Sequence, residues 1–125
     1  MIGNGFKQAN IIGLNDDGTV EKTAAQNLMN AKNVGLFNYM QVNPCRSMSV
    51  AQQVKHVMDE ISADLYEFVW VSVQLNARPS CSWANHDFES NCQYIKDFMK
   101  EFNLNDKWAG VVTDDQTWTQ YMGGR

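Results

Sequence analysis

Short apolar runs alternate along the chain with longer segments in which apolar residues recur every three or four positions. A short run of alternating or continuous apolar residues predicts a strand, and a spacing of three to four predicts an amphipathic helix. The predicted strands are residues 9–14, 36–42, 65–74 and 108–113. The predicted helices are residues 21–33, 50–61, 91–102 and 115–122. The pattern is therefore a strand followed by a helix, repeated four times.

Strands that alternate with helices of this length favour parallel strands joined by helical crossovers. We therefore predict one α/β domain over residues 1–125, with a parallel sheet of about four βα units. Two architectures fit this pattern: a doubly wound open sheet, or part of a β/α barrel. A glycine-rich phosphate loop does not follow any predicted strand, so a nucleotide-binding function has little support.

Composition narrows the function classes. The chain has 125 residues, of which 44% are hydrophobic, which is enough for one modest core. Its net charge of −4 argues against binding to nucleic acid or to an anionic membrane surface. Close-spaced pairs of Cys or His are missing from the sequence, so we expect neither a metal site nor a cofactor.

Candidate chemistry lies at the predicted strand ends, because parallel β/α folds gather ligands at the carboxyl ends of their strands. Side chains alternate along a strand, so Trp70, Ser72 and Gln74 share one face of the third strand. The valines between them share the other face and are expected to pack under helices. The acidic residues at strand ends are Asp16, Asp17, Asp114 and Asp115.

Three cysteines leave the redox state open. Cys81 and Cys92 flank a short polar loop, a spacing that would let a disulfide close it, and Cys45 is then the odd one out. The alternative is three reduced, partly buried thiols. Residues 1–6 lack the basic start and apolar run of a signal peptide, so localisation stays open.

The third strand and the loop after it resemble a known family. The run from residue 69 to 74, then Asn76, the segment Pro79-Ser80-Cys81-Ser82-Trp83, and Ser90-Asn91-Cys92 keep the order and spacing of glycoside hydrolase family 25 lysozymes of protists and nematodes. The resemblance covers most of the chain. It implies an irregular β/α barrel, a secreted or lysosomal setting, and cleavage of the bond between the amino sugars of bacterial peptidoglycan.

The departures from this family concern its catalytic acids, which fall on Ser72 and Gln74. An amide cannot supply a proton at neutral pH, and a serine does not carry the charge that stabilises an oxocarbenium-like state. The expected function is therefore a degenerate lysozyme-like protein without catalysis that binds a glycan or nothing. The alternative is an active muramidase whose acids come from other strand ends.

The strand face, the strand ends and the resemblance together give the expected substrate-binding residues: Trp70, Asn76, Tyr39, Asp114 and Trp83. The family's earlier strand is missing before Gly5, and its later strands are missing beyond Gly124, so we expect a partial barrel. A partial barrel leaves sheet edges open, which predicts a homodimer formed through those edges.

Overall fold

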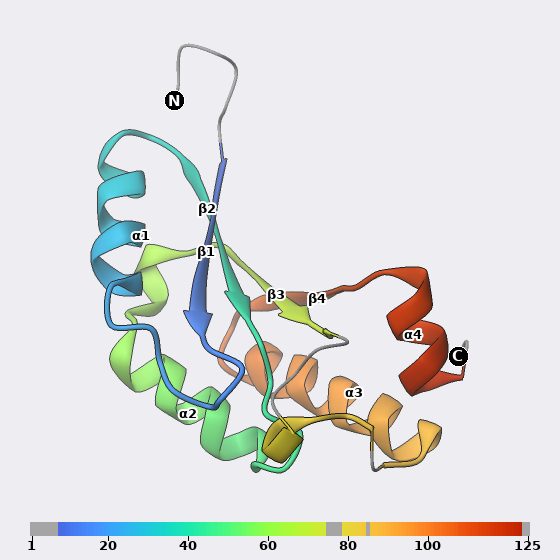
Figure 1. The fold of residues 1–125 in the computed structure, drawn as a ribbon. Helices are drawn as coiled ribbons and strands as arrows, with labels where there is room; N and C mark the ends of the chain where they lie inside the picture. The colour runs from blue at the N-terminus through green and yellow to red at the C-terminus, as the bar shows by residue number, and fades with distance from the viewer. Residues whose placement is uncertain (1–7, 75–78, 85, 124–125) are drawn as a thin grey trace.

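The computed structural model describes residues 8–74, 79–84 and 86–123, and it contains a four-stranded parallel sheet (Figure 1). The strands are β1 (Gln8–Leu14), β2 (Phe37–Val42), β3 (Phe68–Ser72) and β4 (Trp108–Val112). They lie in the order β1-β2-β3-β4 and all pair in parallel. This confirms the predicted α/β fold, and the sheet is not closed into a barrel.

The strand order decides between the two predicted architectures. Parallel crossovers are right-handed, so strands laid down in sequence order bring successive helices to the same side of the sheet. A doubly wound sheet would reverse its order and place helices on both sides. The arrangement is therefore an open sheet of consecutive βα units and not a doubly wound one.

The helices are α1 (Ala24–Asn33), α2 (Val50–Glu60), α3 (Phe88–Leu104) and α4 (Asp115–Met122). Helices α1, α2 and α3 lie along one side of the sheet, and α4 lies near one end of α3 (Figure 1). Two short 3₁₀ helices, η1 (Ala63–Leu65) and η2 (Pro79–Cys81), lie in the connections. Among the described residues, no helix is both long enough and apolar enough to cross a membrane.

Side-chain caps fix where three of the helices begin. Ser49 accepts a hydrogen bond from the backbone N–H of Gln52 at the start of α2, at 3.2 Å. Asp87 and Asp114 cap α3 and α4 in the same way. Helix α1 has no side-chain cap, and it begins three residues later than predicted. The preceding segment is instead tied to β1, because the Glu21 N–H donates to the Gly13 carbonyl at 2.8 Å.

The core lies between the sheet and the helices. The valine face of β3 is buried as predicted, and Val69 and Val71 are fully inaccessible to solvent. The residues that pack around them from the helices and the other strands include Leu14, Leu28, Met40, Val42, Val54, Val57, Ile95, Phe98 and Phe102. The opposite side of the sheet is not covered by a helix of the described part of the chain, and we call it the open face.

Strand β3 is shorter than predicted at both ends, and Leu65, its expected first residue, lies in η1 instead. The buried amide of Asn38 donates to the Leu65 carbonyl at 2.7 Å and to the Leu28 carbonyl at 2.8 Å. Both acceptors lie outside the sheet, so this side chain holds η1 beside α1. The pairing of β3 with β2 then starts only at Phe68.

Candidate functional site

Aromatic rings cover part of the open face. The rings of Phe37, Tyr39, Phe68 and Trp70 form a connected series, with centroid distances of 5.2 Å from Phe37 to Tyr39 and 4.9 Å from Phe68 to Trp70. Tyr39 joins the two pairs at 6.0 Å from Phe68 and 6.3 Å from Trp70. Gly110 leaves room for these rings, because a Cβ there would lie 2.9 Å from Cζ3 of Trp70. This half of the open face is therefore a rigid apolar surface.

Neutral polar side chains lie toward the carboxyl ends of the strands on the same face. Asn10 donates to Oε1 of Gln41 at 3.1 Å, and Gln41 donates to Oδ1 of Asn43 at 3.1 Å. Gln74 donates to the same Asn43 oxygen at 3.3 Å and to Oγ of Ser72 at 3.4 Å. These five side chains form one hydrogen-bonded row across three strands, which we call the amide network.

The chemistry of the amide network is that of recognition. Carboxamides and hydroxyls both donate and accept hydrogen bonds, and none of them exchanges a proton with a substrate near neutral pH. Asn43 and Ser72 are buried, each with 7% of its surface exposed, whereas Gln74 and Asn10 are exposed. The network therefore has a fixed base and a solvent-facing edge that can contact a ligand.

Sequence reasoning identified part of this site. Tyr39, Trp70, Ser72 and Gln74 lie on the open face or at its carboxyl edge, and the structure brings them together. Asn10 and Gln41 were missed, although both occupy alternating strand positions on that face. Of the other expected residues, Asp114 and Trp83 lie elsewhere in the structure, and Asn76 lies outside the described residues.

The expectation that Trp83 contacts substrate does not fit its position in the structure. Its side chain is 1% exposed, and its ring meets Tyr94 edge to face at 5.5 Å. The amide of Asn91 also donates to the Trp83 carbonyl at 3.2 Å. Trp83 is therefore a core residue that anchors the loop before α3, and its ring is not available to a ligand. Asn76 lies outside the described residues.

Two of the four candidate acids, Asp17 and Asp114, accept hydrogen bonds from neighbouring residues in a turn and in a helix cap. Asp17 accepts from the backbone N–H of Thr19 at 3.0 Å and from its hydroxyl at 2.6 Å. Asp114 accepts from the backbone N–H of Thr117 at 2.7 Å. This bond from the Thr117 backbone, more than any other contact, lowers the pKa of Asp114 below its ordinary value. A carboxyl that stays ionised is poorly suited to donate a proton as a general acid.

The cap formed by Asp114 predicts a pH effect on stability. Its folded-state pKa is lowered, so its contribution is present above the unfolded value of about 3.9 and is lost as pH falls through the folded value. We expect Asp114→Ala to unfold at lower urea concentration at neutral pH, with the difference from wild type narrowing in acid. Asp114→Asn keeps a capping oxygen without the charge, so this variant tests the charge alone. A deficit in Asp114→Ala that is the same at every pH would contradict the role of the ionised cap.

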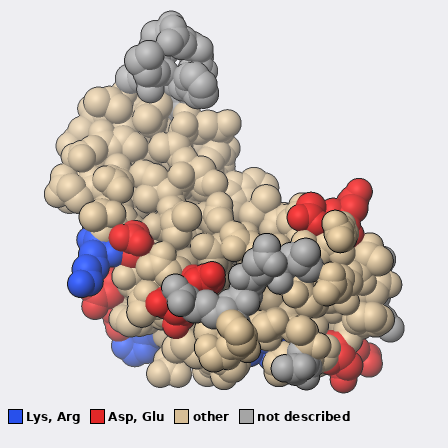
Figure 2. Space-filling model, viewed as in Figure 1, with Lys and Arg blue, Asp and Glu red and all other residues tan. Residues whose placement is uncertain are grey.

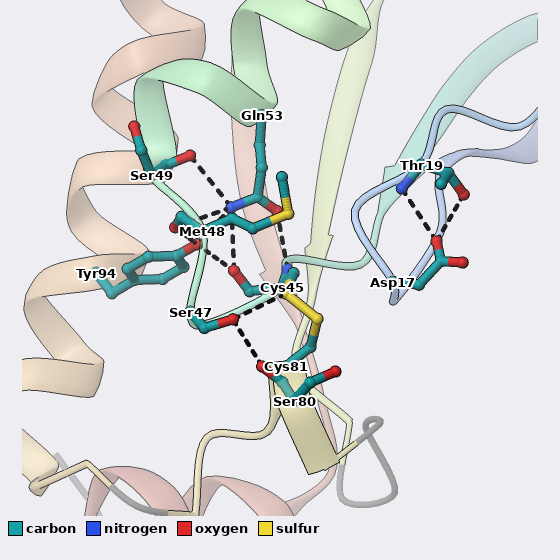
Figure 3. Close-up of a disulfide and its surroundings, with 10 residues drawn as sticks. All are labelled: Asp17, Thr19, Cys45, Ser47, Met48, Ser49, Gln53, Ser80, Cys81 and Tyr94. Carbon is teal, nitrogen blue, oxygen red and sulfur yellow. Dashed lines mark hydrogen bonds between the residues drawn. A yellow bond between two sulfur atoms is a disulfide. The ribbon is translucent and has the colours of Figure 1, made fainter.

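The disulfide joins Cys45 to Cys81, with a Cα–Cα distance of 4.4 Å, and Cys92 is a free, half-buried thiol (Figure 3). The predicted Cys81–Cys92 pair is therefore wrong. Cys92 lies within α3, and its Sγ lies 4.0 Å from the Met122 carbonyl at the end of α4. Cys81 lies in η2 beside the loop that follows β2. Loop spacing did not reveal this orientation, because α3 begins before Cys92 and fixes where its thiol points.

The disulfide belongs to a wider connection between η2 and the loop after β2. The backbone N–H of Arg46 donates to the Cys81 carbonyl at 3.1 Å. The Ser47 hydroxyl donates to the Ser80 carbonyl at 2.6 Å (Figure 3). This loop begins at Asn43, the central acceptor of the amide network. The connection therefore holds the β2 end of the candidate site in place.

The buried side chain of Gln53 also holds the loop that follows β2. Gln53 in α2 is 1% exposed; its Oε1 accepts from the Cys45 N–H at 2.8 Å, and its Nε2 donates to the Cys45 carbonyl at 3.1 Å (Figure 3). Nε2 also lies 2.6 Å from the hydroxyl of Tyr94. Burial raises the pKa of Tyr94 to about 12, so this hydroxyl stays protonated and donates in turn to the loop carbonyls.

Charged side chains are unevenly distributed over the surface. The upper part of the view in Figure 2 shows neither acidic nor basic side chains, whereas acidic ones lie at the left, the centre and the right of its middle and lower parts. Within the described ranges, the His, Cys, Asp and Glu residues do not form a group of three or more that could hold a metal ion. The chemistry available at the open face is therefore neutral hydrogen bonding beside aromatic rings.

Comparison with solved structures finds a protein of similar fold. The structure of a muramidase from Acremonium alcalophilum is similar, with a TM-score of 0.73 at 15% sequence identity. The similarity covers 98% of this chain and 61% of that chain, so the chain spans about three fifths of the muramidase's length. At this identity the similarity shows the fold alone.

The sequence family is more specific. The model of the family described as Lysozyme-like protein 1 matches residues 1–125, and the chain belongs to this family. No curated protein matches the chain by sequence. The lysozyme-like resemblance predicted from the third strand and its loop is thereby confirmed.

Proposed function

We propose that the protein binds a peptidoglycan-type glycan on its open face and does not hydrolyse it. The amide network is the observation that carries this proposal, because it holds neutral groups at Ser72 and Gln74, the two positions to which the family resemblance assigns the acids. Membership of a lysozyme-like family and the fold shared with a muramidase support a glycan as the ligand. The Cys45–Cys81 disulfide supports an oxidising compartment, in line with a secreted protein.

Hydrolysis of a glycosidic bond ordinarily requires two carboxyl groups, one to protonate the leaving oxygen and one to act as nucleophile or base. Ser72 and Gln74 hold each other and Asn43 by neutral hydrogen bonds, so neither role can be filled at these positions. The strand-end acids Asp17 and Asp114 are engaged in a turn and a helix cap. The proposal therefore assigns the site to binding.

Binding has a physical basis in the two halves of the open face. Sugar rings have apolar faces that stack on aromatic side chains, and their hydroxyl and acetamido groups exchange hydrogen bonds with carboxamides. Trp70 and Tyr39 supply the rings, and Gln41 and Gln74 supply carboxamides toward the carboxyl ends of their strands. A neutral stretch of glycan matches a neutral site.

Co-sedimentation with purified insoluble peptidoglycan tests binding. We expect the wild-type chain to sediment with the glycan, and we expect Trp70→Ala to weaken the apparent affinity about tenfold, equivalent to about 1.4 kcal/mol. Phe88→Ala is the matched control, because Phe88 is 45% exposed but lies at the start of α3, away from the sheet. Equal weakening by both variants, or wild-type protein that stays in solution, would refute binding at the open face.

Turbidity of a cell-wall suspension tests hydrolysis separately. We expect wild type to clear the suspension no faster than buffer, and Gln74→Glu to do the same, since one restored carboxyl does not make a pair. Lysis by wild type that disappears in Asp114→Asn would show instead that the acids come from another strand end.

A further inference from the structure

The two edges of the sheet differ in how they are protected. At the β1 edge, the pairing register shifts between Ile12 and Leu14, and Leu14 forms an antiparallel bridge with Val20. Irregularities of this kind blunt a sheet edge against pairing with another chain. Strand β4 pairs with β3 in unbroken register and carries no proline or charge between Trp108 and Val112. Among the described residues, β4 is therefore the unprotected edge.

The β4 edge also exposes apolar side chains. Trp108 is 75% exposed and Val112 is 42% exposed, and both lie on the open face, with Gly110 between them. Leu104, shortly before the strand, is 70% exposed. The indole of Trp108 projects from this short strand. Gly110, two residues later, has no side chain and leaves space beside that indole.

We propose that a second copy of this chain pairs with β4 in antiparallel orientation, about a two-fold axis through Gly110. The Val112 carbonyl accepts from the Val73 N–H at 3.1 Å, so the backbone groups of alternate residues 108, 110 and 112 point toward β3. Those of Ala109 and Val111 point away from the sheet. An antiparallel partner centred on Gly110 places Ala109 opposite Val111 of the second copy, and the reverse, which gives four N–H···O bonds.

The same register matches the side chains. Trp108 comes opposite Val112 of the second copy as a non-hydrogen-bonded pair, in which Cα atoms lie about 4.5 Å apart and side chains are close. Aromatic and β-branched residues opposite each other stabilise antiparallel sheets. Gly110 faces Gly110 of the second copy and leaves room for both indoles. A single five-residue strand is thus complementary to itself.

Charge at the strand ends favours the same partner. Asp106 and Lys107 precede β4, and Asp114 and Asp115 follow it. An antiparallel pair brings the acidic end of each strand toward a start whose two charges offset each other, whereas a parallel pair would bring the two acidic ends together. Because the axis is perpendicular to the sheet, both open faces lie on the same side of an eight-stranded sheet.

Sedimentation velocity over a micromolar concentration series tests the dimer. We expect wild type to dimerise and Val112→Glu to be monomeric, because strand pairing would remove the introduced carboxylate from solvent. Ile12→Glu is the matched control, since Ile12 is 43% exposed on the other edge strand, and we expect it to dimerise like wild type. A monomeric wild type, or equal dissociation of both variants, would overturn the proposal.

Cysteine cross-linking tests the register and does not depend on the loss of a contact. Trp108→Cys combined with Val112→Cys places two thiols within disulfide reach across the proposed axis, twice in each dimer. We expect a covalent dimer on non-reducing gels. Trp108→Cys alone should give none, because its counterpart lies opposite residue 112. Cross-linking by the single variant, or none by the double variant with native circular dichroism, would contradict this register.

Discussion

Removing the disulfide with Cys45→Ala and Cys81→Ala lowers the expected free energy of unfolding by about 4 kcal/mol. The bond closes a loop with a sequence separation of 36, and cross-linking a loop of that length removes a corresponding entropy from the unfolded chain. Both cysteines are buried, so their loss also weakens packing near the start of α2. Urea unfolding, followed by tryptophan fluorescence, measures the change.

Cys92→Ala is the control for this prediction. Its thiol is half-buried and forms no disulfide, so we expect a loss of about 1 kcal/mol or less. Peptide mapping without reduction should recover a fragment that links Cys45 to Cys81. A fragment that links Cys81 to Cys92, together with strong destabilisation by Cys92→Ala, would reverse the assignment.

Gln53→Ala gives the second large expected effect, a loss of about 3 kcal/mol in the free energy of unfolding. The truncation removes the acceptor of the buried Cys45 N–H and the donor to the Cys45 and Met48 carbonyls. It also removes the bond to the Tyr94 hydroxyl. A buried donor without a partner is the main source of the cost.

Gln52→Ala is the matched control, because the neighbouring side chain has the same chemistry on the same helix but is exposed. We expect its stability to lie within about 0.5 kcal/mol of wild type. Gln53→Glu should be at least as damaging as Gln53→Ala, because it places a charge in the buried site. If Gln53→Ala and Gln52→Ala unfold at the same urea concentration, the buried network does not stabilise the loop.

These two predictions bear on the candidate site as well as on stability. Cys45 follows Asn43 by two residues, and Asn43 accepts hydrogen bonds from both Gln41 and Gln74. The disulfide and the Gln53 cluster hold that loop from opposite sides. We therefore expect either change to weaken glycan binding more than its distance from the open face suggests.

Several features of the fold followed from local pattern. Alternation along β3 placed the valines in the core and Trp70, Ser72 and Gln74 on the other side, because side chains on a strand point to opposite faces in turn. Ser49 directly precedes the predicted helix 50–61, and serine is a preferred residue at that position, so its capping role is also a local property of the sequence. The repeated strand-helix order also predicted the parallel sheet.

Where sequence reasoning failed, the deciding contacts join different elements of the fold. Trp83 was expected among the substrate-binding residues, but contacts with Tyr94 and Asn91 of α3 hold it in the core. Its exposure depends on how the loop folds over α3, and residue type does not determine that. The same applies to Cys81, whose three-dimensional neighbour is 36 residues earlier in the chain.

The sequence by itself determined the α/β class, the faces of the strands and the absence of carboxylates at positions 72 and 74, because strand periodicity and residue chemistry are local properties. The tertiary structure alone decided that Asn10, Gln41, Asn43 and Gln74 form one network and that Cys45 pairs with Cys81. Strand order and crossover geometry set these contacts, and side-chain spacing along the chain does not specify them.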